Sequence, residues 1–212
     1  KSKFQYILDN YNGRLPVKIK AIPEGTAVSV QNVLMTIENT DPNCFWLTNF
    51  IETLLMQIWY PSTVATLSRE IKKVLINYYE ETASESAKAG IEYVLNDFGF
   101  RGVSSYESAE LGGMAHLVNF MGTDTVAGIH GVREYYNMDD DMPGFSIIAS
   151  EHSVTTAWGK DGELEAYANI VGLLEPDRLV GCVTDSYDHM NAIHMIGTHL
   201  KEEIMSSGGC LV

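Results

Sequence analysis

Hydrophobic and polar positions follow one pattern in residues 1–90 and another in residues 91–212. Between residues 14 and 40, apolar and polar residues alternate around a Pro/Gly turn, which is typical of antiparallel β structure. Residues 45–60 are mostly apolar, and after Pro61 apolar residues recur at helical spacing. Residues 1–90 are therefore predicted to form a β-rich module with connecting helices.

The second pattern is a repeated order of strand, loop and helix. Short apolar runs predict the strands, and segments with helical spacing separate them. The predicted strands cover residues 91–95, 123–127, 145–149, 179–183 and 209–212. Parallel strands need a crossover connection of about a dozen residues or more, and the segments between these strands are long enough for one. The order therefore predicts βα units and an α/β fold.

Acidic residues stand at or beside four of these predicted strands. They are Asp97, Asp124, Glu151 and Asp185. In β/α barrels the carboxyl ends of successive strands meet at one mouth, where catalytic groups collect. These acids and the neighbouring His152 therefore suggest a single polar site. The alternative is that each acid caps the next helix, since Asp is a favoured N-cap, although Glu is a poor one.

The composition allows a globular enzyme and limits its partners. The chain has 212 residues, of which 45% are hydrophobic, and this excludes collagen-like, disordered and disulfide-scaffold proteins. It carries 14 Lys and Arg against 28 Asp and Glu, a net charge of -14 that repels nucleic acid and anionic lipid. Any bound phosphate must therefore be held by placed amides, a few basic residues or a metal.

The cysteines and the ends of the chain add further expectations. Cys44, Cys182 and Cys210 are widely spaced and form no CxxC pair, which predicts reduced thiols without a zinc site. The sequence has no apolar run of about 18 residues and no signal segment, so we expect a soluble cytoplasmic protein with no membrane partner. The chain starts at Lys1 and stops in an apolar strand-like run, so we expect an excerpt of a longer protein.

Eight segments share their residues and their order with a known enzyme family. They are residues 22–25 (IPEG), 38–42 (ENTDP), 59–61 (WYP), 97–105 (DFGFRGVSS), 122–128 (GTDTVAG), 151–153 (EHS), 157–161 (AWGKD) and 185–188 (DSYD). Through these segments the chain resembles the nicotinamide phosphoribosyltransferase family, a branch of the type II phosphoribosyltransferases. The resemblance covers nearly the whole chain and corresponds to the middle portion of the family's sequence. It implies an irregular, partial β/α barrel over residues 91–212, preceded by the β-rich module, and a homodimer.

The resemblance implies a reaction as well as a fold. The phosphoribosyl group of phosphoribosyl pyrophosphate is expected to pass to nicotinamide, giving nicotinamide mononucleotide and pyrophosphate in NAD salvage. Such a transfer develops an oxocarbenium-like centre and releases a polyanion, so it needs carboxylates and a cation. Mg²⁺ prefers carboxylate, water and phosphate oxygens, which makes Asp185 or Glu151 its candidate ligand. ATP is expected as a coupled, non-obligatory co-substrate.

The resemblance also implies which residues bind the substrates. Phe98 matches an aromatic residue that stacks on the pyridine ring. Asp124 matches a carboxylate that accepts a hydrogen bond from the amide and repels the acid form of the base. Arg101 matches a basic residue at the base and phosphate site, and Ser146 matches a position near the amide. From the sequence alone, the ordinary interpretations are a core Phe and a surface salt-bridge Arg.

His152 matches a histidine that ATP phosphorylates in the family. Neutral imidazole is nucleophilic near neutral pH, and an acid can orient it, so Glu151 and Asp185 are the expected catalytic partners of His152. The alternative is an ordinary hydrogen-bonded histidine at a strand end.

Two other functions stay open at this point. One is a nicotinate phosphoribosyltransferase, which is expected to place a neutral or basic group where Asp124 stands. The other is a catalytically inactive dimerisation or regulatory fragment.

Overall fold

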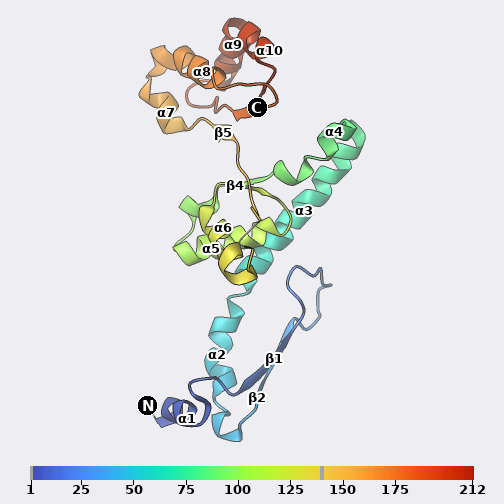
Figure 1. Cartoon of the computed structure of the whole chain (residues 1–212), viewed down its shortest axis with the longest axis vertical. Helices are drawn as coiled ribbons and strands as arrows, with labels where there is room; N and C mark the ends of the chain where they lie inside the picture. Colours follow the sequence, from blue (N-terminus) through green and yellow to red (C-terminus); the bar gives the residue numbers. More distant parts are fainter. Residues whose placement is uncertain (1, 139–140) are drawn as a thin grey trace. The chain divides into compact units, whose positions relative to one another are not determined.

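The computed structural model describes residues 2–138 and 141–212 of the chain (Figure 1). The chain forms two compact units, Lys1–Phe145 and Ser146–Val212, and each is described by itself. Both units combine helices with short strands, so the predicted α/β class is confirmed. The described residues form three small sheets and none of them closes into a barrel, so the partial barrel stays a prediction.

An antiparallel hairpin and two helices make up the N-terminal part of the first unit. Its elements are α1 (Ser2–Tyr11), β1 (Val17–Ala21), β2 (Met35–Asn39), the 3-10 helix η1 (Pro42–Cys44) and α2 (Leu47–Met56). Ile19 of β1 stands opposite Ile37 of β2, in the antiparallel pairing that the alternation of residues 14–40 predicts. The buried core of this part consists of Ile7, Cys44, Leu47 and Ile51.

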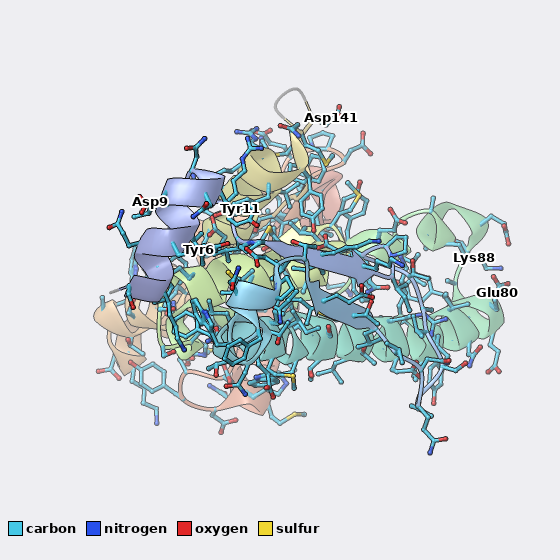
Figure 2. The ribbon with its side chains drawn as sticks, turned by 90° about the horizontal axis from the view of Figure 1, so that it is seen from below. Tyr6, Asp9, Tyr11, Glu80, Lys88 and Asp141 are labelled. Atoms are coloured by element: carbon cyan, nitrogen blue, oxygen red, sulfur yellow. The ribbon has the colours of Figure 1, made fainter. Side chains whose placement is uncertain are left out.

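The carboxylate of Asp41, next to η1, joins α1 to the rest of this N-terminal part. Asp41 accepts hydrogen bonds from the hydroxyls of Tyr6 and Tyr11, both at 2.8 Å. The two tyrosines lie on α1, where Figure 2 labels them. Asp41 also accepts the backbone N–H of Asn43 at 2.8 Å and thereby caps η1.

A long helix and a closely packed helix pair form the rest of the first unit. The elements are α3 (Trp59–Thr82), α4 (Glu85–Lys88), η2 (Ile91–Tyr93), β3 (Asn96–Asp97), η3 (Gly99–Gly102), α5 (Tyr106–Leu117), β4 (Gly122–Thr123) and α6 (Val126–Tyr136). Pro61 lies in the first turn of α3, where its missing N–H costs no helical hydrogen bond. Near the other end of α3, Glu80 pairs with Lys88 of α4 at 2.9 Å (Figure 2).

The strands predicted for residues 91–95 and 123–127 are wrong in their bounds. Residues Ile91–Tyr93 form the 3-10 helix η2, and only the short strands β3 and β4 pair, in parallel. α6 already begins at Val126, and Gly128 in its first turn packs against α5. A Cβ built on Gly113 of α5 would lie 2.8 Å from the Gly128 Cα, so this contact needs glycine on both helices.

The second unit is a parallel sheet with helices between its strands. Its elements are β5 (Ile148–Ala149), α7 (His152–Ala157), η4 (Lys160–Gly162), α8 (Glu163–Val171), β6 (Leu179–Gly181), α9 (His189–His199), α10 (Lys201–Ser207) and β7 (Cys210–Leu211). The strands pair in the order β5-β6-β7, as the repeated strand, loop and helix pattern predicts. Its core consists of Tyr167, Val171, Leu174, Val180, Ala192 and Leu200. Over the described part of the chain, no helix has both the length and the apolar character needed to cross a membrane.

Candidate active site

A histidine and an aspartate meet at one edge of the sheet in the second unit. His152 begins α7 shortly after β5, and Asp185 lies in the loop after β6. Because β5 and β6 are parallel neighbours, both residues follow carboxyl ends of adjacent strands. The His152 Nε2 lies 2.8 Å from the Asp185 Oδ1, and both side chains are exposed to solvent. The sequence-predicted pair is thus brought together at an accessible edge.

The loops that carry this pair are fixed by the backbone around Ser150. The Ser150 N–H donates to the carbonyl of Gly181 at 2.9 Å, and the Ser150 Oγ accepts the N–H of Val183 at 2.8 Å. These bonds extend the β5–β6 pairing into the loops that lead to His152 and Asp185. The hydrogen bond from His152 is the largest of the effects that hold the pKa of Asp185 below its usual value. Asp185 is therefore a carboxylate at neutral pH.

The structure gives Glu151 a role in the local backbone. Its side chain accepts the N–H of Ser153 at 2.7 Å and the Ser153 hydroxyl, which makes Glu151 the N-cap of α7. The helix-cap alternative is therefore correct for Glu151, despite the weak capping preference of glutamate. The carboxylate that bonds the His152 ring is that of Asp185. Any catalytic task of Glu151 stays a prediction.

The first unit brings together a second set of predicted residues. Phe98 follows β3 and Asp124 follows β4, and these two strands are parallel neighbours. The Asp124 N–H donates to the carbonyl of Asp97 at 2.9 Å, which ties the two loops together. Phe98 is 64% exposed, so it is not the core phenylalanine that the sequence alone favours. An exposed ring and a carboxylate thus extend from neighbouring strand ends.

The remaining predicted residues lie in a turn, on a 3-10 helix and at the start of the second unit. Asp97 accepts the N–H of Gly99 at 2.7 Å and stabilises the turn that carries Phe98. Arg101 is exposed on η3, one turn after Phe98. Ser146 begins the second unit, and its hydroxyl donates to the Ile147 carbonyl at 3.4 Å. Four residues at strand ends were predicted, and two of them, Asp97 and Glu151, support turns or caps.

The structure also reveals polar groups that the sequence did not indicate. His116 is buried at the end of α5 and contacts Ser68 of α3 and the carbonyl of Gly122. Thr184 Oγ1 lies 2.8 Å from the His189 Nδ1, beside Asp185. The sequence carried no motif for either contact: the Ser68 contact joins residues 48 positions apart through packing of α3 on α5, and the Thr184 contact depends on the conformation of the loop before α9.

One group of metal-ligating residue types lies on the α5–α6 pair. Ligand atoms of Glu110, His130 and Glu134 all lie within 4.8 Å of one another. Glu110 Oε1 is 3.0 Å from the His130 Nδ1, whereas Glu134 Oε2 is 3.7 Å from the His130 Nε2. A metal ion binds one imidazole nitrogen, whereas here the two nitrogens of His130 face different carboxylates.

The comparisons with known proteins all find phosphoribosyltransferases similar to this chain. The model of the nicotinate phosphoribosyltransferase family matches residues 93–210. A protein of Xanthomonas campestris pv. campestris is 46% identical over 208 residues, which are 97% of this chain and 44% of that protein. Proteins of Acinetobacter baylyi and Mycoplasma genitalium are 37% and 35% identical, over 92% and 94% of this chain and 38% and 42% of their own lengths. All three relatives are named nicotinamide phosphoribosyltransferase, and the chain spans about two fifths of their length.

Proposed function

The chain belongs to the nicotinate phosphoribosyltransferase family, and we propose that it provides part of the active site for transfer of a phosphoribosyl group to nicotinamide. The donor is phosphoribosyl pyrophosphate, and the products are nicotinamide mononucleotide and pyrophosphate. The single observation that carries this proposal from the geometry is the placement of Phe98 and Asp124 after the paired strands β3 and β4. The name of the relatives supports the amide as the base.

Phe98 and Asp124 divide recognition of the base between them. The exposed ring of Phe98 offers a face on which a flat pyridine ring stacks, an interaction of about 0.5–1.5 kcal/mol beyond burial. The carboxylate of Asp124 only accepts hydrogen bonds, so it favours the amide NH₂ and repels the negative charge of nicotinate. Arg101 and Ser146 are proposed to contact the phosphate and the amide, respectively.

The pair of His152 and Asp185 is proposed to couple ATP to this transfer. A carboxylate is an acceptor, so the Nε2 at 2.8 Å from Asp185 carries the proton and Nδ1 keeps a lone pair. Nδ1 then attacks the terminal phosphorus of ATP, the bond to the bridging oxygen breaks, and ADP leaves. Asp185 stabilises the positive charge that the phosphorylated ring holds.

Mg²⁺ is the cation proposed to assist the leaving pyrophosphate. It would supply positive charge to the phosphate oxygens of the departing group. Asp185 suits this ion better than Glu151, because it is an exposed carboxylate and the Glu151 side chain caps α7 through Ser153.

Nicotinate is the second candidate base, because the matching family model carries the name of the nicotinate enzyme. Asp124 argues against it through charge repulsion. A homodimer in the cytoplasm is part of the proposal through the family resemblance, and light scattering of the purified protein tests the dimer.

The deciding experiment measures product from phosphoribosyl pyrophosphate and Mg²⁺ with nicotinamide or nicotinate as the base. The complete protein and its Asp124→Asn variant are compared side by side. Activity on the amide, with a preference that the variant loses, supports the proposal. Activity on nicotinate alone supports the second candidate, and product with neither base supports a catalytically inactive role.

A further inference from the structure

A buried histidine contacts the strand that leads to Asp124. His116 lies in the last turn of α5 and is 5% exposed. Its Nε2 is 2.9 Å from the carbonyl oxygen of Gly122 in β4, and its Nδ1 is 3.3 Å from the Ser68 Oγ of α3. The imidazole therefore joins two helices to the short strand β4.

The Gly122 carbonyl assigns the donor atom of the His116 ring. This carbonyl can only accept a hydrogen bond, so the Nε2 carries a proton and donates it. The Nδ1 faces the Ser68 hydroxyl, which can act as donor or acceptor towards it. The ring also stacks on Phe120, with centroids 5.6 Å apart and planes 14° apart. These contacts hold the imidazole in one orientation.

The loop between His116 and β4 is equally fixed. The Lys72 Nζ donates to the Asn119 carbonyl at 2.6 Å and lies 5.5 Å from the centre of the Phe120 ring. The Asn119 side chain donates to the Ala65 carbonyl at 3.0 Å. The donor that reaches Gly122 therefore sits on a rigid support of α3 and α5.

Gly122 can be held only through its backbone. A Cβ at this position would lie 2.9 Å from both the Asn96 Oδ1 and the Leu95 carbonyl, so no side chain fits there. Two residues further on, the Asp124 N–H bonds to the Asp97 carbonyl at 2.9 Å. Hydrogen bonds thus hold the backbone at Gly122 and again at Asp124, two residues further along the chain.

We propose that His116 is a positioning residue for Asp124 in recognition of the amide base. Its Nε2 proton fixes the Gly122 carbonyl and thereby the direction in which the Asp124 carboxylate leaves β4. The proposal rests on the proposed function, since it assigns the base to Asp124. It adds a side chain that touches neither base nor phosphate.

A double-mutant cycle in the complete protein tests this role. The His116→Leu variant introduces an apolar side chain of similar size and removes the donor to Gly122. The Michaelis constant for nicotinamide is expected to rise about tenfold, and that for phosphoribosyl pyrophosphate to stay within about twofold. In the Asp124→Asn background, His116→Leu is expected to change the constant for nicotinamide less than about twofold, because the contact it positions is gone.

Three further variants complete the design. His116→Gln retains an N–H donor of sufficient reach and is expected to restore most of the affinity for nicotinamide. His130→Leu, which changes an exposed histidine on the neighbouring helix α6, is the matched control and is expected to leave both constants unchanged. If His116→Leu does not fold, Ser68→Ala enters the same cycle, with an expected rise of about threefold in the constant for nicotinamide.

The outcomes distinguish a failure of the positioning role of His116 from a failure of the proposed function. An equal loss in both backgrounds, or no loss in either, overturns the positioning role while leaving the proposed function intact. Absence of product from nicotinamide in the unmutated protein overturns the proposed function and, with it, the role assigned to His116.

Discussion

The Nε2 of His152 lies 2.8 Å from the Oδ1 of Asp185, although the two residues are 33 positions apart in the chain. The contact forms because β5 and β6 are adjacent and parallel, so their carboxyl ends deliver both side chains to one edge. It orients the ring so that the Nδ1 keeps the lone pair. This is the arrangement that the proposed function requires, with His152 as the nucleophile and Asp185 as its orienting acid.

Asp185→Asn is expected to weaken phosphorylation of His152 by ATP. The asparagine amide can present its N–H₂ group to the ring, which favours the tautomer with the proton on the wrong nitrogen. We expect the rate of phosphoryl transfer to fall at least about a hundredfold. Incorporation of labelled phosphate from ATP measures this rate, and Asp161→Asn, at an exposed position of η4, is the control. An unchanged rate in Asp185→Asn would show that the contact does not serve the nucleophile.

The same contact predicts a pH dependence of stability. The hydrogen bond from His152 lowers the pKa of Asp185 in the folded state, so folding favours the carboxylate. The stabilisation is therefore complete above the unfolded pKa of about 4 and disappears as the pH falls through the lower folded value. Thermal unfolding of the unmutated protein and of Asp185→Asn measures the difference. We expect the unmutated protein to have the higher Tm at pH 5–6 and the difference between the two midpoints to shrink as the pH falls below the unfolded pKa of about 4. A constant difference over this range would contradict the linkage.

The hydrophobic runs located the strand ends and so predicted that His152 and Asp185 share one site, while the family resemblance named Glu151 and Asp185 as the candidate partners of His152. The sequence-based interpretation assigned Glu151 a catalytic role and undervalued its capping role, because capping preferences are averages and Ser153 supplies two donors to this particular glutamate. It also extended a strand through residues 123–127. That error arose because the contact of Gly128 with Gly113 depends on helix packing, which a single-sequence pattern does not contain. His116 escaped notice for the same reason.

Asp41→Ala is expected to loosen the N-terminal part of the first unit. The variant removes the cap of η1 and the common acceptor of the Tyr6 and Tyr11 hydroxyls. We expect the Tm to fall by about 5 °C. The hydrogen bond to Asp41 is also the main reason why the pKa of Tyr11 is raised to about 12. In Asp41→Ala that pKa is expected to return to about 10.

Ultraviolet titration reports this second effect. The difference between Asp41→Ala and the Asp41→Ala/Tyr11→Phe double variant isolates the phenol of Tyr11. A Tyr11 pKa that stays near 12 without Asp41 would show that other groups raise it.

Gly113→Ala is expected to destabilise the first unit despite the better helix propensity of alanine. The added methyl group would meet the Gly128 backbone at 2.8 Å, and backbone cannot move aside as a flexible side chain can. Such overpacking costs about 3 kcal/mol, against a propensity gain of about 1 kcal/mol. The net loss of about 2 kcal/mol corresponds to a Tm lower by about 5 °C.

Gly197→Ala separates the two effects. Gly197 lies within α9, and a Cβ there would meet nothing within 4 Å, so only the propensity gain remains. Its free energy of unfolding is expected to rise by about 0.5–1 kcal/mol, measured by urea denaturation beside Gly113→Ala. If both alanine variants were stabilised, α5 and α6 could move apart at little cost. The close approach of the two glycines would then not determine the position of β4 and Asp124. If only Gly113→Ala is destabilised, the glycine contact fixes the position of α6, the helix that follows Asp124.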